Sequence, residues 1–176
     1  VEERFAVPIS AIPKRVVAAF LSAEDKSFYQ HPGIDLPSIG AAVIKNVILV
    51  VQGRRPVGAS TITQQVAKNF LLTNEVSLER KIKEAIIALR LEQAYSKDRI
   101  LELYLNEIYL GRSAYGVAVA ALNYFDKSLD ELTVAEAAYL AALPKAPNNY
   151  NPITKKPAAL ARRNWVLDQM RDNGYI

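Results

Sequence analysis

Two adjacent carboxylates, Glu24 and Asp25, are the first residues of the sequence that could do chemistry together. Apolar residues at helical spacing precede them, so we expect the pair at the C-terminal end of a helix. The helix dipole disfavours negative charge there, so local stability does not explain the pair. Glu24 could act as a general base that Asp25 tunes or orients. The alternative is a solvated acidic pair beside Lys26.

Phe28, His31 and Gly33 follow the acidic pair closely. His31, Pro32 and Gly33 together indicate a turn. A lone histidine in a turn is more often a hydrogen-bonded turn residue than a catalyst, and both interpretations stay open here.

A second cluster joins a glycine turn to a helix start. Ser60 and Thr61 follow Gly58, and Thr61 with Gln64 has the spacing of a capping box. Free N–H groups and the positive end of the helix dipole would make an anion site here. The alternative is an ordinary capped helix, since the Walker pattern of nucleotide-binding loops is absent. Further polar residues that could extend the donor set along the helix are Gln64, Gln65 and Lys68, and Asn69 follows them.

The third cluster is Arg80, Lys81 and Glu84, which share one stripe of a helix. Two cations beside one carboxylate suit a diphosphate, with or without a bridging divalent cation. The alternative is a set of surface ion pairs, each worth only a few tenths of a kcal/mol.

Composition restricts the chemistry. The 176 residues correspond to about one domain, and 51% hydrophobic residues exclude a disordered chain. Cys is absent and His occurs once, which excludes thiolate nucleophiles and multi-histidine metal sites. Acid–base chemistry is therefore expected to use carboxylates. A net charge of +4 is too small to indicate nucleic acid, but suits an anionic membrane surface or a phosphate-bearing ligand.

The most apolar segment, 39–51, contains Lys45 and Asn46. It is shorter than the roughly 20 apolar residues that cross a bilayer. Because the chain starts at Val1 rather than Met, we expect it to be an excised fragment, and a signal or anchor upstream of Val1 would not be seen in this sequence.

Hydrophobic periodicity predicts a mainly helical chain. The fourth helix should bury Ile82, Ile86 and Leu89. We expect residues 52–58 to form a mobile basic turn, residues 144–152 to be extended around three prolines, and residues 47–51 to allow a short strand. The expected helices lie near 13–25, 35–50, from 60, 78–95, 97–106, after Gly116, 133–143 and 157–172. Thr133 with Glu136 has capping-box spacing at the start of the helix that ends near Leu143.

Together these segments resemble the peptidoglycan glycosyltransferase (transglycosylase) domain of class A penicillin-binding proteins. The resemblance covers nearly the whole chain, and we treat residues 1–176 as one such domain. It implies that the family's membrane anchor and any transpeptidase domain lie outside this excised chain. Five family motifs occur in order: E-D-x-x-F-x-x-H-x-G from Glu24, G-x-S-T-x-x-Q-Q-x-x-K-N from Gly58, R-K-x-x-E from Arg80, the segment 100–116, and the segment 135–152.

The resemblance implies a mainly α fold, with a lysozyme-like head lobe and a smaller membrane-facing jaw lobe that contains residues 39–51. The implied reaction polymerises lipid II. The 4-hydroxyl of an acceptor lipid II attacks the lipid-linked growing glycan strand, the anomeric configuration inverts, and undecaprenyl diphosphate leaves. The implied location is the outer, periplasmic face of the bacterial inner membrane, with no nucleic acid and with cell-wall synthesis partners unknown.

The resemblance also implies roles for the candidate residues. Glu24 matches the family's general base, and Glu84 matches its second acidic residue, proposed to orient cations or hold a metal. The diphosphate would be received by Lys68, Arg80 and Lys81. A divalent cation, Mg²⁺ or Mn²⁺, is compatible with this site, and the metal's identity is open. Substrate contacts are expected from Asp25, Phe28, Ser60, Thr61, Gln64, Gln65 and Asn69.

Two positions depart from the family pattern. Val76 stands where many relatives have a basic residue, which predicts weaker donor binding unless Arg54 or Arg55 compensates. Val57 stands where a polar residue is common. Two other functions remain as alternatives: a lysozyme-like lytic glycosidase, which would not need the cations, and a non-catalytic membrane-surface module.

Overall fold

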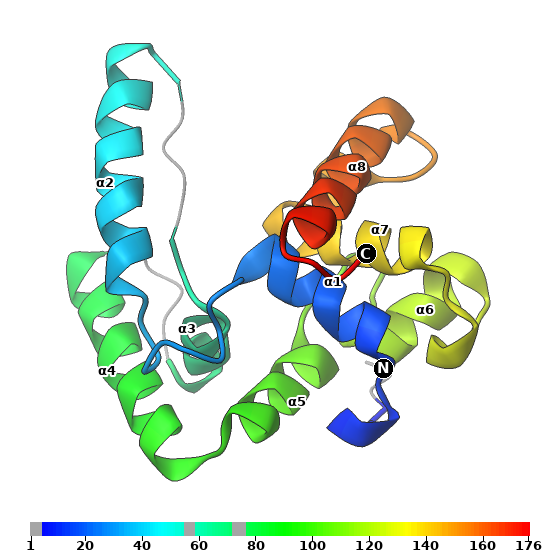
Figure 1. Cartoon of the computed structure of the whole chain (residues 1–176), viewed down its shortest axis with the longest axis horizontal. Helices are drawn as coiled ribbons and strands as arrows, with labels where there is room; N and C mark the ends of the chain where they lie inside the picture. The colour runs from blue at the N-terminus through cyan, green and yellow to red at the C-terminus, as the bar shows by residue number, and fades with distance from the viewer. Residues whose placement is uncertain (1–4, 55–58, 72–76) are drawn as a thin grey trace. The chain divides into compact units, whose positions relative to one another are not determined.

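The computed structural model describes residues 5–54, 59–71 and 77–176 (Figure 1). The chain divides into two compact units, residues 1–26 with 101–176, and residues 27–100. Within the described ranges the secondary structure is helical, with one isolated β-bridge between Tyr109 and Tyr115. The expected mainly α fold is therefore confirmed. The α-helices are α1 (Lys14–Glu24), α2 (Leu36–Val51), α3 (Ile62–Ala67), α4 (Leu78–Ala94), α5 (Lys97–Glu107), α6 (Val117–Phe125), α7 (Val134–Ala142) and α8 (Lys156–Asp172).

Local capping residues set several helix starts. At α3 the Thr61 hydroxyl accepts from Gln64 N–H at 3.0 Å, and Gln64 Oε1 accepts from Thr61 N–H at 2.9 Å. Thr133 and Glu136 form the same reciprocal pair at α7. Both capping boxes confirm the sequence prediction, because this motif depends only on residues three positions apart.

The first unit is built on α1, which packs against α7 and α8 (Figure 1). Small residues allow the close approach, since Ala19 of α1 and Ala137, Ala138 and Ala141 of α7 are fully buried. Phe20 of α1 meets Tyr104 of α5 edge to face, with ring centroids 6.2 Å apart. These contacts fix the C-terminal end of α1, where the acidic pair lies.

The second unit packs α3 against α4. Gly33 has φ +118°, and a Cβ atom there would lie 2.9 Å from the Ala88 carbonyl oxygen of α4. The backbone before α2 thus approaches α4 more closely than any residue with a side chain allows.

The buried face of α4 differs from the prediction. Ile82 is 54% exposed and Ile86 is 45% exposed, and Leu89 is only half-buried. The buried residues are instead Glu84, Ala88 and Leu91. Helix α4 packs against α3 and against the backbone at Gly33, so these tertiary contacts, and not the apolar stripe, decide which face is buried.

Helix α2 extends away from α3 and α4 within its unit (Figure 1). It continues through residues 47–51, so the expectation of a short strand there is wrong. Leu49 is its one buried residue, and large apolar side chains are exposed along its length. Among the described residues no helix reaches the length and hydropathy that crossing a bilayer requires. The exposed apolar residues of α2 are Leu36, Val43, Ile44, Val47, Ile48, Val50 and Val51.

The proline-rich segment also differs from expectation. It forms two 3₁₀ turns, η4 (Leu143–Lys145) and η5 (Pro147–Tyr150), rather than an extended stretch. Proline's fixed φ suits the first positions of a 3₁₀ turn as well as it suits extended backbone. The other 3₁₀ turns are η1 (Ile9–Ala11), η2 (Lys68–Phe70) and η3 (Leu129–Glu131).

Candidate active site

The acidic pair lies at the end of α1. Glu24 is the last helical residue, and Asp25 is the C-cap, whose N–H donates to Leu21 O at 2.9 Å. Glu24 is half-buried with its Oε1 atom inaccessible to solvent, and Asp25 is 7% exposed. The low exposure of Asp25 and of the Glu24 Oε1 atom differs from that of a simple solvated acidic pair.

Tyr104 places a phenol beside this pair. Its side chain is 2% exposed, and its hydroxyl makes no hydrogen bond within the described part of the chain. Burial raises the pKa of Tyr104 well above its ordinary value, and the charges of Glu24 and Asp25 raise it further. The phenol therefore stays protonated and can only donate to a neighbouring carboxylate.

Arg162 of α8 supplies a positive charge to the same region. Its guanidinium carbon lies 3.9 Å from the ring centroid of Trp165. Burial lowers the pKa of Arg162, while Tyr150 and Glu24 act in the opposite direction. An arginine remains charged in this setting, so it favours the ionised form of Glu24. Sequence reasoning did not select Tyr104 or Arg162, because each lies at least 80 positions from Glu24 in the sequence.

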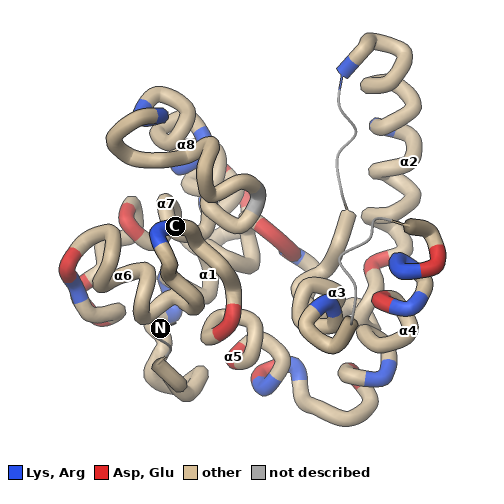
Figure 2. The backbone as a smooth tube through the Cα atoms, turned by 180° about the vertical axis from the view of Figure 1, so that it is seen from behind, with Lys and Arg blue, Asp and Glu red and all other residues tan. Residues whose placement is uncertain are grey.

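In the second unit, Lys81 of the R-K-x-x-E stripe contacts the turn before α3. Lys81 Nζ donates to Ser60 Oγ at 2.6 Å and to Glu84 Oε1 at 2.7 Å. Glu84 is 1% exposed, whereas the Lys81 side chain is 50% exposed. The buried carboxylate thus anchors an ammonium that still reaches solvent, and Figure 2 shows the mixed charges along α4.

The other predicted cation and amide donors lie on α3, on η2 and at the start of α4. Lys68 and Asn69 are exposed, and Gln65 and Arg80 are half-buried. With Lys81 they provide three positively charged side chains in one unit, a composition suited to a diphosphate.

Besides Asp25, three predicted substrate contacts are buried, all in the second unit. Phe28, Thr61 and Gln64 are 0%, 2% and 3% exposed. The capping box also occupies the N–H groups of Thr61 and Gln64, so the expected free backbone donors are already used at these two residues. The structure gives these side chains supporting positions, and the Thr61 hydroxyl donates to Gly33 O at 2.7 Å.

His31 lies in a hydrogen-bonded turn. Its Nδ1 accepts from Gly33 N–H at 3.1 Å, and its carbonyl oxygen accepts from Lys97 Nζ at 2.6 Å. Lys97 also pairs with Glu92 at 2.7 Å and lies 4.5 Å from the Phe28 ring centroid. This network ties the turn to α4 and α5, which agrees with the structural interpretation of His31.

The donor set for a metal is sparse. Glu84 is the carboxylate of the R-K-x-x-E stripe, and Lys81 occupies its Oε1. Within residues 5–54, 59–71 and 77–176 no three His, Cys, Asp or Glu side chains are grouped as metal ligands. A divalent cation at the diphosphate stays a prediction, with Glu84 as its candidate protein ligand.

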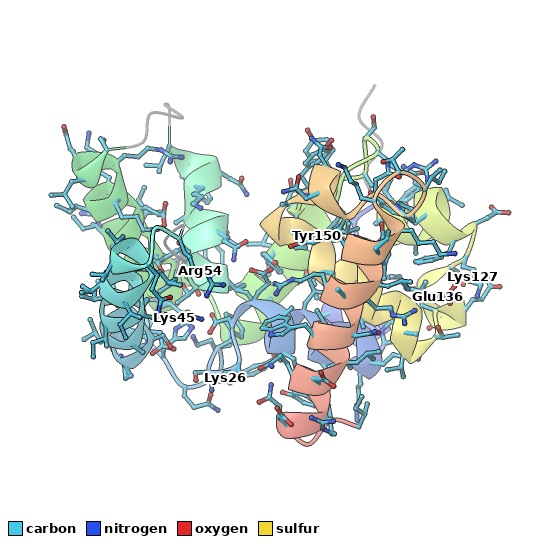
Figure 3. The ribbon with its side chains drawn as sticks, turned by 90° about the horizontal axis from the view of Figure 1, so that it is seen from above. Lys26, Lys45, Arg54, Lys127, Glu136 and Tyr150 are labelled. Atoms are coloured by element: carbon cyan, nitrogen blue, oxygen red, sulfur yellow. The ribbon has the colours of Figure 1, made fainter. Side chains whose placement is uncertain are left out.

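A separate cavity of about 200 Å³ lies in the first unit between α6, α7 and α8. Tyr124, Glu136 and Tyr139 contribute to its lining, and none of the predicted site residues does. Lys127 pairs with Glu136 at 2.9 Å, and the Tyr139 hydroxyl donates to the Tyr150 carbonyl at 2.8 Å; Figure 3 labels Lys127, Glu136 and Tyr150.

The predicted site residues divide between the units. Glu24 and Asp25 belong to the first, and the others belong to the second. Gly58, Val57, Arg55 and Val76, and with them the mobile-turn expectation for 55–58, lie outside the described residues.

Comparisons with known proteins bear on the whole chain. A family model described as Transglycosylase matches residues 1–171. Penicillin-binding protein 1A of Rickettsia conorii is 56% identical over 99% of this chain, and the proteins of the same name from Aquifex aeolicus and Escherichia coli are 52% and 50% identical over 100% and 99%. The chain spans 22%, 24% and 20% of these relatives' lengths.

A solved structure of a penicillin-binding protein 1A agrees with these sequence comparisons. The crystal structure of penicillin-binding protein 1A from Haemophilus influenzae matches 99% of this chain and 16% of that chain, with TM-score 0.56 and 30% identity. The family model, the relatives and the helical fold together lead to one assignment: the chain belongs to the transglycosylase family.

Proposed function

We propose that this chain polymerises lipid II into peptidoglycan glycan strands during bacterial cell-wall synthesis. The donor is the lipid-linked growing strand, the acceptor is lipid II, and undecaprenyl diphosphate is released with inversion at the anomeric carbon. The observation that carries the proposal is the Lys81–Glu84 pair, because a buried carboxylate holds a solvent-reaching ammonium beside Ser60 within the matched family motif.

In this proposal Glu24 accepts the proton of the acceptor 4-hydroxyl as that oxygen attacks the donor sugar. A carboxylate must be ionised to serve as a base, and Arg162 favours that form. Asp25 is the C-cap at the same end of α1.

Leaving-group stabilisation falls to the cations of the second unit. Diphosphate leaves readily once its developing negative charge is balanced, so positioned cations contribute more than a strong acid. Lys68, Arg80 and Lys81 perform this role. Glu84 acts by fixing the Lys81 ammonium, and no step requires a metal. Polar contacts come from Ser60, Gln65 and Asn69, with Phe28, Thr61 and Gln64 supporting them.

A membrane surface is the proposed setting, at the outer face of the bacterial inner membrane. The exposed apolar residues of α2 suit insertion among lipid acyl chains, as in an interfacial helix. Lys45 of α2 and Arg54 just after it, both labelled in Figure 3, add positive charge for anionic headgroups. Replacing Ile44 and Val47 by Ser should weaken sedimentation with anionic vesicles, and unchanged sedimentation would contradict this part of the proposal.

The direct test is chain growth from labelled lipid II in detergent, with products sized on a gel. The proposal expects a ladder of polymers. Cleavage of finished glycan without growth from lipid II would instead indicate a lytic glycosidase. Vesicle binding without either activity would indicate a membrane-surface module.

A further inference from the structure

The buried hydroxyl of Tyr104 is not explained by the fold. Its oxygen is inaccessible to solvent and makes no hydrogen bond to the described residues. A buried polar group without a partner is uncommon and costs stability. A phenylalanine at this position would keep the contact with Phe20 and avoid that cost, so packing alone does not account for the oxygen.

The position of Tyr104 relates it to Glu24. Phe20 lies four residues before Glu24 in α1, so the two side chains occupy the same face one turn apart. The Tyr104 ring contacts Phe20 edge to face at 6.2 Å. Its hydroxyl is also close enough to respond to the charges of Glu24 and Asp25.

The other charged groups near Glu24 come from neighbouring elements. Asp25 follows it in the chain, and Arg162 comes from α8 with Tyr150 beside it. Helix α7 also packs against α1, but its Glu136 pairs with Lys127 and its Tyr139 donates to the Tyr150 carbonyl. In the first unit, Tyr104 is thus a neutral donor among charged neighbours.

We propose that Tyr104 is a positioning residue for Glu24: its hydroxyl donates a hydrogen bond to the ionised Glu24 carboxylate in the substrate complex. The bond holds one carboxylate oxygen, so the other is oriented toward the acceptor hydroxyl. No proton leaves the phenol, since burial raises the pKa of Tyr104 far above physiological pH. The inference rests on the proposed role of Glu24 as the base.

Tyr104→Phe tests the inference because it removes only the oxygen. A donor to an ionised carboxylate stabilises the charged form, so its loss makes the carboxylate easier to protonate. The acidic limb of the pH profile of kcat should therefore move to higher pH by about one unit. KM should stay within about twofold, because a buried side chain does not contact lipid II.

Tyr139→Phe is the matched control. That variant loses the hydrogen bond to the Tyr150 carbonyl, so its Tm should fall by roughly 2–4 °C while its pH profile stays unchanged. Tyr104→Phe should keep or raise its Tm, since its hydroxyl has no partner to lose in the described structure.

Parallel measurement of Glu24→Gln separates two failures. If Glu24→Gln polymerises lipid II normally, the proposed base is wrong. If Glu24→Gln is inactive and Tyr104→Phe keeps the wild-type acidic limb, only the inference about Tyr104 is overturned. A Tm loss in Tyr104→Phe equal to that of Tyr139→Phe would also overturn it, because the hydroxyl would then have a structural partner.

Discussion

Lys81 Nζ lies 2.7 Å from Oε1 of Glu84, and Glu84 is 1% exposed while the Lys81 side chain is half exposed. A buried carboxylate without its ammonium would be costly, whereas the ammonium alone could be hydrated. The pair is therefore asymmetric. Glu84 depends on Lys81 to offset the cost of burying its charge, whereas Lys81 depends on Glu84 to hold its ammonium in position.

Glu84→Gln should lower both stability and donor binding. The free energy of unfolding should fall by about 1–2 kcal/mol, a value reduced because Lys81 reaches solvent. The control is Glu79→Gln, since Glu79 pairs with Lys83 at 3.1 Å with both side chains exposed. Urea unfolding should show a change below about 0.5 kcal/mol for the control. Equal losses in the two variants would contradict the asymmetry.

Lys68→Ala should weaken engagement of the donor diphosphate. Lys68 is exposed at η2 and contributes positive charge to the second unit. We expect KM for lipid II to rise about tenfold, with elongation lost first at limiting substrate. Lys83→Ala removes an exposed lysine at an unspecified position of the R-K-x-x-E motif and should leave KM unchanged. A similar rise in both variants would mean that net charge alone is responsible.

Gly33→Ala should destabilise the second unit. The φ of +118° and the 2.9 Å approach to the Ala88 oxygen both exclude a Cβ, so we expect a loss of about 2–3 kcal/mol. Gly40→Ala is the matched control, because Gly40 lies within α2 with open space around its Cα. That variant should gain roughly 0.5–1 kcal/mol. Chemical unfolding of both variants tests the contrast, and a neutral Gly33→Ala would contradict it.

Glu136→Gln should show a pH-dependent loss of stability. Burial acts to raise the pKa of Glu136, but the Thr133 N–H and Lys127 outweigh it and lower the pKa below 4.5. Stability from a lowered carboxyl pKa is present above the unfolded value and disappears as pH falls through the folded value. Glu136→Gln should therefore lose about 0.5–1 kcal/mol at pH 7 and almost nothing near pH 3.

The control is a double-mutant cycle that combines Glu136→Gln with Lys127→Met. If the ion pair is responsible, the double variant should be no less stable than Glu136→Gln alone. A loss that persists at pH 3, measured by thermal unfolding, would assign the effect to packing around the cavity instead.

The sequence predicted features that depend on neighbours a few residues apart. The capping boxes at Thr61 and Thr133 are local, and the structure contains both. The buried face of α4 was mispredicted because it depends on tertiary packing against α3 and against the backbone at Gly33, more than 50 positions before Ala88, which the isoleucine stripe does not reveal.

The candidate site shows the same division between local features, which the sequence predicted, and tertiary contacts, which it did not. Motif spacing selected Glu24, Lys81 and Glu84, and the structure joins the last two directly. Tyr104 and Arg162 were missed because their relation to Glu24 exists only after α5 and α8 have packed in the first unit. Their residue types gave little signal, since a tyrosine and an arginine are ordinary in helices.

The central claim is that the Glu24 carboxylate accepts the proton of the acceptor hydroxyl. Glu24→Gln should reduce lipid II polymerisation at least about 100-fold, while its stability stays equal or rises slightly because a negative charge leaves the C-terminal end of α1. Asp172→Asn, at the C-terminal end of α8, should keep full activity. Measured with labelled lipid II, a folded Glu24→Gln variant that polymerises at the wild-type rate would contradict the account.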